Sequence, residues 1–189
     1  LFRSDLLFDE ALPEQGRNFA NKIWNAFRLV KGWQTDSLIV QPESSKIAIE
    51  WFNEKINEAN FILEDLYKQF RISEALMIVY KLFWDEFSSW YLEVVKPEYQ
   101  KPIDIKTFSE TITFFDKLMR LLHPFMPFIT EEIWQILDER KKGESICVAS
   151  MPEPTNANEI LLSDFEKTKE IISGIRTIRK EKNIAFKDK

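Results

Sequence analysis

Long stretches of this 189-residue chain carry apolar residues at alternating spacings of three and four, and this pattern most limits the folds open to it. Between residues 52 and 70, Phe52, Ile56, Ala59 and Leu63 share one side when the segment is read as a helix. The chain has only four glycines, and its eight prolines lie mostly between such stretches. Because both residues interrupt helices, we expect an all-α antiparallel bundle of about five to six long helices, with little or no β structure.

Capping residues and prolines mark where these helices begin and end. We expect helices over residues 16–31, 42–70, 73–95, 104–122, 130–137 and 161–182. The chain then divides into a leading segment (1–15), a main bundle (16–140) and a final segment (141–189) that leads toward a further domain. Because the first residue is not methionine and the last residues are lysine-rich, we expect a piece of a longer protein.

Three local features carry expectations about packing. Prolines 124 and 127 require a bend, which we expect to be buried because Phe125, Met126 and Phe128 flank them, with His123 hydrogen-bonded at the corner. We expect the short apolar piece 146–148 to be extended. On the last helix we expect the apolar side chains to point inward, namely Phe165, Ile172, Ile175 and Ile178.

Composition excludes several classes of function. The one cysteine, Cys147, cannot form an internal disulfide, and one histidine cannot build a His-rich metal cluster. The sequence contains no glycine-rich phosphate loop, nucleophile elbow or apolar run long enough to span a membrane. We therefore expect a cytoplasmic, monomeric protein with no catalytic residues, no metal and no cofactor of its own.

Positive charge is concentrated at two places on an acidic chain. The net charge is −5, yet residues 171–189 carry six basic and two acidic residues, or +4, which leaves −9 for the rest. The expected first helix, residues 16–31, carries four Lys and Arg residues and no acid. Binding depends on such local fields and not on the total charge, so two surfaces could attract a polyanion.

Read as a helix, residues 16–31 separate into an apolar side and a polar side. Phe19, Ala20, Ile23, Ala26, Phe27 and Val30 fall together, opposite Arg17, Asn21, Trp24, Asn25, Arg28 and Lys31. Guanidinium groups beside amides and an indole suit phosphates and unstacked bases, which makes RNA the first hypothesis. The alternative is that another helix buries Trp24 and that the arginines pair with carboxylates elsewhere.

Four sequence motifs resemble, in order, the region after the catalytic domain in valyl-tRNA synthetases. They are GRNFANKIWNAFR (16–28), FWDEFSSWYLEVVKP (83–97), LLHPFMPFITEEIW (121–134) and IRTIRKEKNIAFK (175–187). The family often has a proline near residues 184–186, and this chain has none. The resemblance implies a helical anticodon-binding bundle that holds valine tRNA while the catalytic domain of the same polypeptide attaches valine with ATP.

The resemblance places the first helix against the anticodon loop and so suggests a role for each polar residue. Arg17 and Arg28 would donate to phosphates or base edges, Asn21 and Asn25 would read unpaired bases, and Trp24 would stack on a base. Lys22 and Lys31 would anchor the RNA backbone. On the last helix, Arg176 and Arg179 would form a second surface, toward the tRNA stem or toward the catalytic domain. Two alternatives stay open: the equivalent module of an isoleucyl-, leucyl- or methionyl-type synthetase, and a protein-interaction scaffold without RNA.

Overall fold

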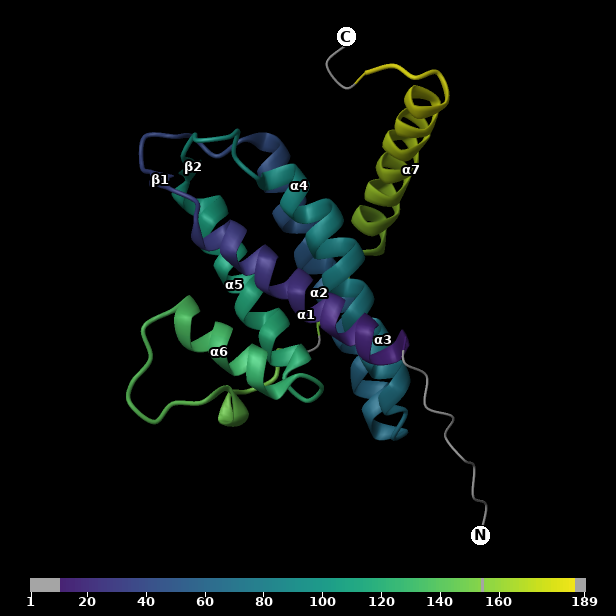
Figure 1. Cartoon of the computed structure of the whole chain (residues 1–189). Coiled ribbons are helices and arrows are strands. Elements are labelled where there is room, and N and C mark those ends of the chain that lie inside the picture. Colours follow the sequence, from purple (N-terminus) through teal and green to yellow (C-terminus); the bar gives the residue numbers. More distant parts are fainter. Residues whose placement is uncertain (1–10, 154, 186–189) are drawn as a thin grey trace.

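Helices form most of the computed structural model, which describes residues 11–153 and 155–185 (Figure 1). Two expectations concern residues outside this range: most of the leading segment (1–15), and the end of the final segment from residue 186 onward. The elements in chain order are α1 (Ala11–Lys31), β1 (Thr35–Asp36), α2 (Glu43–Lys68), α3 (Ile72–Lys81), the π-helix η1 (Leu82–Tyr91), α4 (Leu92–Val95), β2 (Ile103–Asp104), α5 (Ile105–Leu122), α6 (Pro127–Leu137), the 3-10 helix η2 (Ile146–Val148) and α7 (Glu159–Glu181). The expected all-α bundle is confirmed.

Aromatic rings from four helices form the centre of the core. Phe52 of α2 lies 5.1–5.3 Å, between ring centroids, from Phe87 and Tyr91 of η1 and from Phe114 of α5. Phe27 of α1 meets Phe115 of α5 at 6.1 Å. Each fully buried ring of this size contributes about 1.5–3 kcal/mol by leaving water. The apolar side of α1 therefore faces the bundle, as the spacing predicts, and its polar side faces outward.

The expected helix over 73–95 is continuous in space, but its middle third is a π-helix. In η1 the hydrogen bonds reach five residues back, as shown by the amide of Leu92, which donates to the carbonyl of Phe87. On one side, Trp84 lies 6.1 Å from the ring of Phe19 on α1. On the other, the guanidinium of Arg176 on α7 lies 5.2 Å from the ring of Trp90. The π-helix thus packs between α1 and α7.

A two-residue parallel pairing brings distant loops together. Thr35 of β1 pairs with Ile103 of β2, and Asp36 pairs with Asp104. Asp104 is buried, and its carboxylate accepts a hydrogen bond from the amide of Thr107 at 2.8 Å, which caps the first turn of α5. The pairing holds residues 97–102 beside the end of α1.

Two helices begin earlier than expected. Helix α1 begins at Ala11 and not at residue 16, since Pro13 lies in the first turn, where amides have no partner inside the helix. Helix α6 begins at Pro127 and not at Thr130, for the same reason. The expectation of a buried bend was partly wrong: Phe125 and Met126 are half-buried, but Phe128 on the first turn of α6 is 90% exposed.

Two expectations about the final segment were wrong. Residues 146–148 form a 3-10 turn, in which Ser145 caps the amide of Cys147, and are not extended. On α7, Ile175 and Ile178 are exposed, and the helix packs on α2 near its start. There the ring of Phe165 stacks on Trp51 with centroids 4.0 Å apart. The second half of α7 extends away from the bundle (Figure 1).

Candidate nucleic-acid interface

The polar face of α1, defined here by Arg17, Asn21, Asn25 and Arg28, is exposed along its length. On the opposite side Phe19, Ile23, Ala26, Phe27 and Val30 are buried. The packing of the apolar side fixes the direction in which the polar face points. Among the described residues, the guanidinium of Arg28 has no hydrogen-bond or ion-pair partner. It is therefore free to bind an anion without breaking an internal contact.

Arg17 has a partner, but only on the surface of its own helix. Its guanidinium donates to Glu14 at 2.9 Å, and both side chains are more than half exposed. A surface pair of this kind contributes about 0–1 kcal/mol, so a phosphate can displace it. Sequence reasoning missed the pair because Glu14 precedes the segment that was read as a helix.

Neighbouring elements engage the two remaining lysine candidates on α1, whereas Trp24 contacts its own helix. The ammonium of Lys22 lies 4.2 Å from the centre of the Trp84 ring, and burial lowers its pKa while Asp85 opposes the shift. Lys31 donates to the carbonyl of Ile136 on α6 at 3.1 Å. Trp24 is 36% exposed, with its ring 5.5 Å from Phe27. Neither lysine is as free as Arg28 to reach a ligand.

The two arginines of α7 are on a different surface. Arg176 is exposed and lies over Trp90, whereas Arg179 is half-buried and donates to the carbonyl of Ala185. Helix α7 packs on α2, while α1 packs against α5, α6 and η1. The structure therefore does not bring Arg176 and Arg179 together with the polar face of α1 (Figure 1).

A cavity of about 480 Å³ lies at the end of α1, next to Arg28. We refer to it as the α1-end cavity. Its walls come from the last turn of α1, the start of the following loop and the segment 97–101. The lining residues are Arg28, Leu29, Gly32, Trp33, Gln34, Pro97, Glu98, Tyr99, Gln100 and Lys101. Its volume falls within the range of small-ligand sites.

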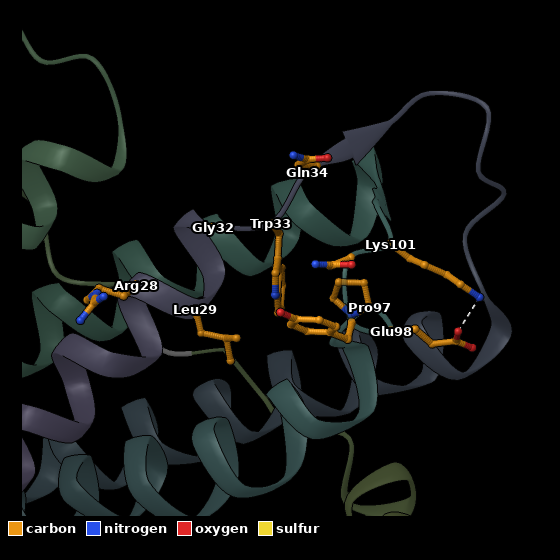
Figure 2. A pocket seen from close by; sticks show the side chains of 10 residues that line it. Arg28, Leu29, Gly32, Trp33, Gln34, Pro97, Glu98 and Lys101 are labelled. Carbon is orange, nitrogen blue, oxygen red and sulfur yellow. Dashed lines mark ion pairs between the residues drawn. The ribbon is translucent and has the colours of Figure 1, made fainter.

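Aromatic rings and polar groups alternate around this cavity. Figure 2 shows the Trp33 side chain extending from the end of α1 between Leu29 and Pro97, with Arg28 at one edge and Gln34 above. Tyr99 is 90% exposed. Trp33 is half-buried against the core, so Tyr99 is the more accessible ring for stacking on an unpaired base, and the neighbouring amides can read base edges. The sequence analysis missed Trp33 and Tyr99. A signal for Tyr99 was available, because it lies in a short segment between Pro97 and Pro102, where a loop is expected.

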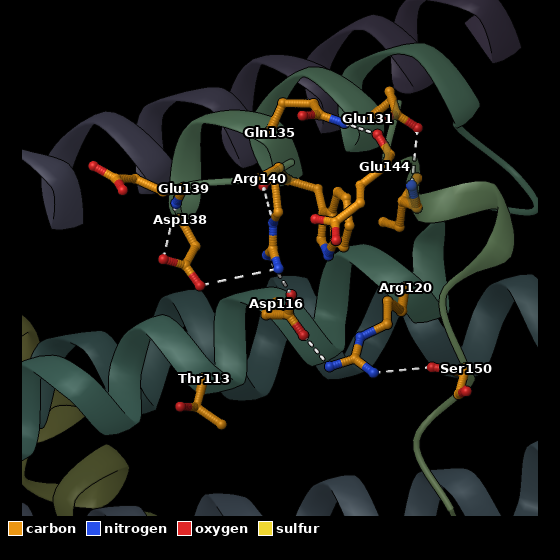
Figure 3. Close-up of polar contacts among 12 residues, drawn as sticks. Thr113, Asp116, Arg120, Glu131, Gln135, Asp138, Glu139, Arg140, Glu144 and Ser150 are labelled. Carbon is orange, nitrogen blue, oxygen red and sulfur yellow. Dashed lines mark hydrogen bonds and ion pairs between the residues drawn. The ribbon is translucent and has the colours of Figure 1, made fainter. Parts of the chain in front are cut away.

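A cluster of charged side chains forms ion pairs between α5 and the loop after α6. Asp116 accepts from Arg120 on the same helix and from Arg140 at 3.1 Å, and Arg140 lies 3.7 Å from the centre of the Trp134 ring (Figure 3). Arg120 also donates to the carbonyl of Ser150 at 2.9 Å. These contacts hold the loop in place. They also engage both Arg120 of α5 and Arg140 of the loop, so neither is available for RNA.

Two further results concern the sequence predictions. His123 is hydrogen-bonded at the corner as expected, with Nδ1 2.8 Å from the hydroxyl of Thr130. Within residues 11–153 and 155–185, we find no helix with the length and apolar character needed to cross a membrane.

The comparisons with known proteins define the class to which this helical bundle belongs. The family model for the anticodon-binding domain of tRNA ligases matches residues 50–189, so the chain belongs to this family. Helix α1 precedes the matched range, but the relatives described next align over nearly the whole chain.

The relatives identify the particular ligase that the chain resembles. It is 60% identical over 185 residues to the valine–tRNA ligase of Parabacteroides distasonis and 56% identical over 186 residues to that of Porphyromonas gingivalis. A more distant relative, the valine–tRNA ligase of Pseudothermotoga lettingae, is 37% identical over 184 residues. These alignments cover 96–98% of the chain and 21% of each relative, so the chain spans about a fifth of their length.

Proposed function

We propose that this chain recognises the anticodon arm of valine tRNA as part of a valine–tRNA ligase. The proposal rests on Arg28, which has no hydrogen-bond or ion-pair partner within the described part of the chain and lies on the exposed polar face of α1, where it lines the α1-end cavity. Membership of the anticodon-binding family supplies the kind of ligand. The valine ligases that align over 96–98% of the chain supply the amino acid.

The proposal assigns a different RNA contact to each part of this surface. Arg28, and Arg17 after it releases Glu14, would bind phosphates or base edges along α1, with Asn21 and Asn25 reading unpaired bases. Trp33 and Tyr99 would stack on bases at the α1-end cavity. The other predicted residues would have smaller effects on RNA affinity, because each side chain already contacts another group within the protein. These residues are Lys22, Trp24, Lys31, Arg176 and Arg179.

The proposal also assigns roles outside this chain. Activation of valine with ATP and its transfer to tRNA would belong to the catalytic domain of the parent enzyme, which we expect to be a cytoplasmic monomer. Residues 1–15 would lead from that domain, 16–140 would form the recognition bundle, and 141–189 would lead onward.

The test is titration of the chain with a fluorescent valine anticodon stem-loop at several salt concentrations. Arg28→Ala should weaken binding and reduce the slope of log K against log[salt] by about 0.7–0.9, the contribution of one phosphate contact. Arg17→Ala should act in the same direction but less, because Glu14 competes for its guanidinium. Arg71→Ala is the matched control, since Arg71 is also exposed and pairs with Glu74 three residues away, at the start of α3.

Aromatic substitutions test the α1-end cavity separately. Tyr99→Ala should cost about 1–3 kcal/mol of binding free energy, roughly a 5- to 150-fold loss of affinity, with no loss of stability because the ring is exposed. Unchanged RNA affinity in Arg28→Ala and Tyr99→Ala would contradict the proposed face. Tighter binding of an isoleucine anticodon stem-loop than of the valine one would contradict the assignment of the amino acid.

A further inference from the structure

Three side chains with metal-binding atoms meet at the corner between α5 and α6. His123 follows the last residue of α5, Glu131 lies on α6, and Cys147 lies in η2. Their ligand atoms all lie within 4.8 Å of one another. An imidazole nitrogen, a carboxylate oxygen and a thiol sulfur are the three protein donor types that zinc accepts. Sequence reasoning looked for a His-rich cluster and so overlooked a mixed set.

The hydrogen bonds of His123 orient its ring for coordination. The hydroxyl of Thr130 donates to the carbonyl of Met126 at 2.8 Å, so its oxygen is left to accept from Nδ1 of His123, also at 2.8 Å. A proton on Nδ1 leaves the lone pair of Nε2 free in the neutral ring. That lone pair faces the sulfur of Cys147 at 3.2 Å. A hydrogen bond from the far nitrogen fixes the tautomer and the orientation of a metal-bound histidine, and the Thr130 hydroxyl accepts that bond here.

Glu131 holds the segment that carries Cys147. One carboxylate oxygen accepts from the hydroxyl of Ser145 at 2.7 Å and from the amide of Ile146 at 3.2 Å. The other accepts from Gln135 at 2.7 Å, as Figure 3 shows. A carboxylate has about four acceptor positions, of which these bonds use three.

We propose that Nε2 of His123, a carboxylate oxygen of Glu131 and the sulfur of Cys147 bind one Zn²⁺, with water as the fourth ligand. Ideal tetrahedral bonds would place the nitrogen and the sulfur about 3.5 Å apart, close to the 3.2 Å observed. The thiol proton passes to solvent, and the thiolate and carboxylate then neutralise the two charges of the ion. The metal would tie η2 to the α5–α6 corner, and the inference does not depend on RNA binding.

Cobalt(II) is a suitable probe because cobalt bound to a thiolate absorbs light and zinc does not. The chain has one cysteine and one histidine, so each spectroscopic signal has one source. Titration of the reduced chain should give a thiolate-to-cobalt charge-transfer band that saturates at one cobalt per chain and disappears when zinc is added. Cys147→Ser should abolish the band. His123→Gln and Glu131→Gln should each weaken binding at least about tenfold.

The matched control is Glu132→Gln, which alters the exposed neighbouring carboxylate and should leave cobalt binding unchanged. A second measurement needs no substitution: on addition of zinc, the nitrogen resonance of Nε2 in His123 should shift far more than that of Nδ1. The inference is overturned if cobalt gives no charge-transfer band, if His123→Gln binds as tightly as the original chain, or if two chains share one metal through their cysteines.

Discussion

Replacing Lys169 with methionine should destabilise the attachment of α7 to the bundle. The ammonium lies 2.8 Å from Glu86 on η1 and 2.8 Å from Glu166 on α7, and 5.5–5.6 Å from the rings of Trp51 and Trp90. Methionine keeps most of the packed chain length but removes the charge. Glu86 then loses its ion pair at 2.8 Å, and the longer-range charge of Lys55 offsets the mostly buried carboxylate only in part.

The size of the stability loss depends on how well water can solvate Glu86 and Glu166 once the ammonium of Lys169 is gone. Removing one member of a fully buried ion pair costs about 3–5 kcal/mol, whereas an exposed pair costs 0–1 kcal/mol. The side chains of Lys169 and Glu86 are 11% and 21% exposed, nearer the buried limit, and Glu166 is 44% exposed. We therefore expect a loss of about 2 kcal/mol in unfolding free energy, which corresponds to a fall of roughly 4–8 °C in Tm for a chain of this size.

Urea unfolding followed by circular dichroism measures this loss, and a double-mutant cycle identifies its source. Adding Glu86→Gln to Lys169→Met should recover at least about 1 kcal/mol, because the neutral amide needs no cation. Lys167→Met is the control, since its pair with Asp164 at 2.9 Å is well exposed and should contribute less than about 0.5 kcal/mol. If Lys169→Met were no less stable than Lys167→Met, or if the cycle gave no coupling, the reasoning would be refuted.

Two further predictions concern buried hydrogen bonds. Tyr91→Phe removes the hydroxyl that lies 2.8 Å from Thr111 and should cost about 0.5–1.5 kcal/mol in urea unfolding at pH 7. Burial also raises the pKa of Tyr91, so the folded protein holds this proton more tightly; stability should fall as the pH rises above about 10, and less so in the variant. Asp104→Ala removes the cap of α5 and should cost about 1–2 kcal/mol, measured by thermal unfolding, whereas Asp104→Asn should retain most of the stability.

The sequence predicted those features that depend on periodicity along one segment. The apolar side of α1 was predicted correctly because Ile23, Phe27 and Val30 recur at helical spacing, and the same spacing places the polar face outward. The predicted helix starts were less accurate. A helix can begin at a proline, because the first turn needs no amide donor, so α6 begins at Pro127 and not after it.

Features that depend on contacts between distant segments were not predictable. The α1-end cavity joins Trp33 to Tyr99, which are far apart in the sequence and lie next to the two strands of the short β1–β2 pairing. The partners of Lys22 and Lys31 lie on η1 and α6, so their engagement could not be inferred from α1 alone. The exposure of Phe128 likewise depends on the direction of α6 after the bend and not on its apolar character.

The π-helical stretch in η1 has a practical consequence for anyone who redesigns this domain. Counting in heptads along residues 82–91 will assign side chains to the wrong neighbours, because each turn there holds more residues than an α-helical turn. Deleting or inserting one residue in this stretch would rotate Trp84 and Trp90 relative to each other, so that α1 and α7 could no longer both keep their aromatic contacts. Length within η1 is therefore under tighter constraint than its composition.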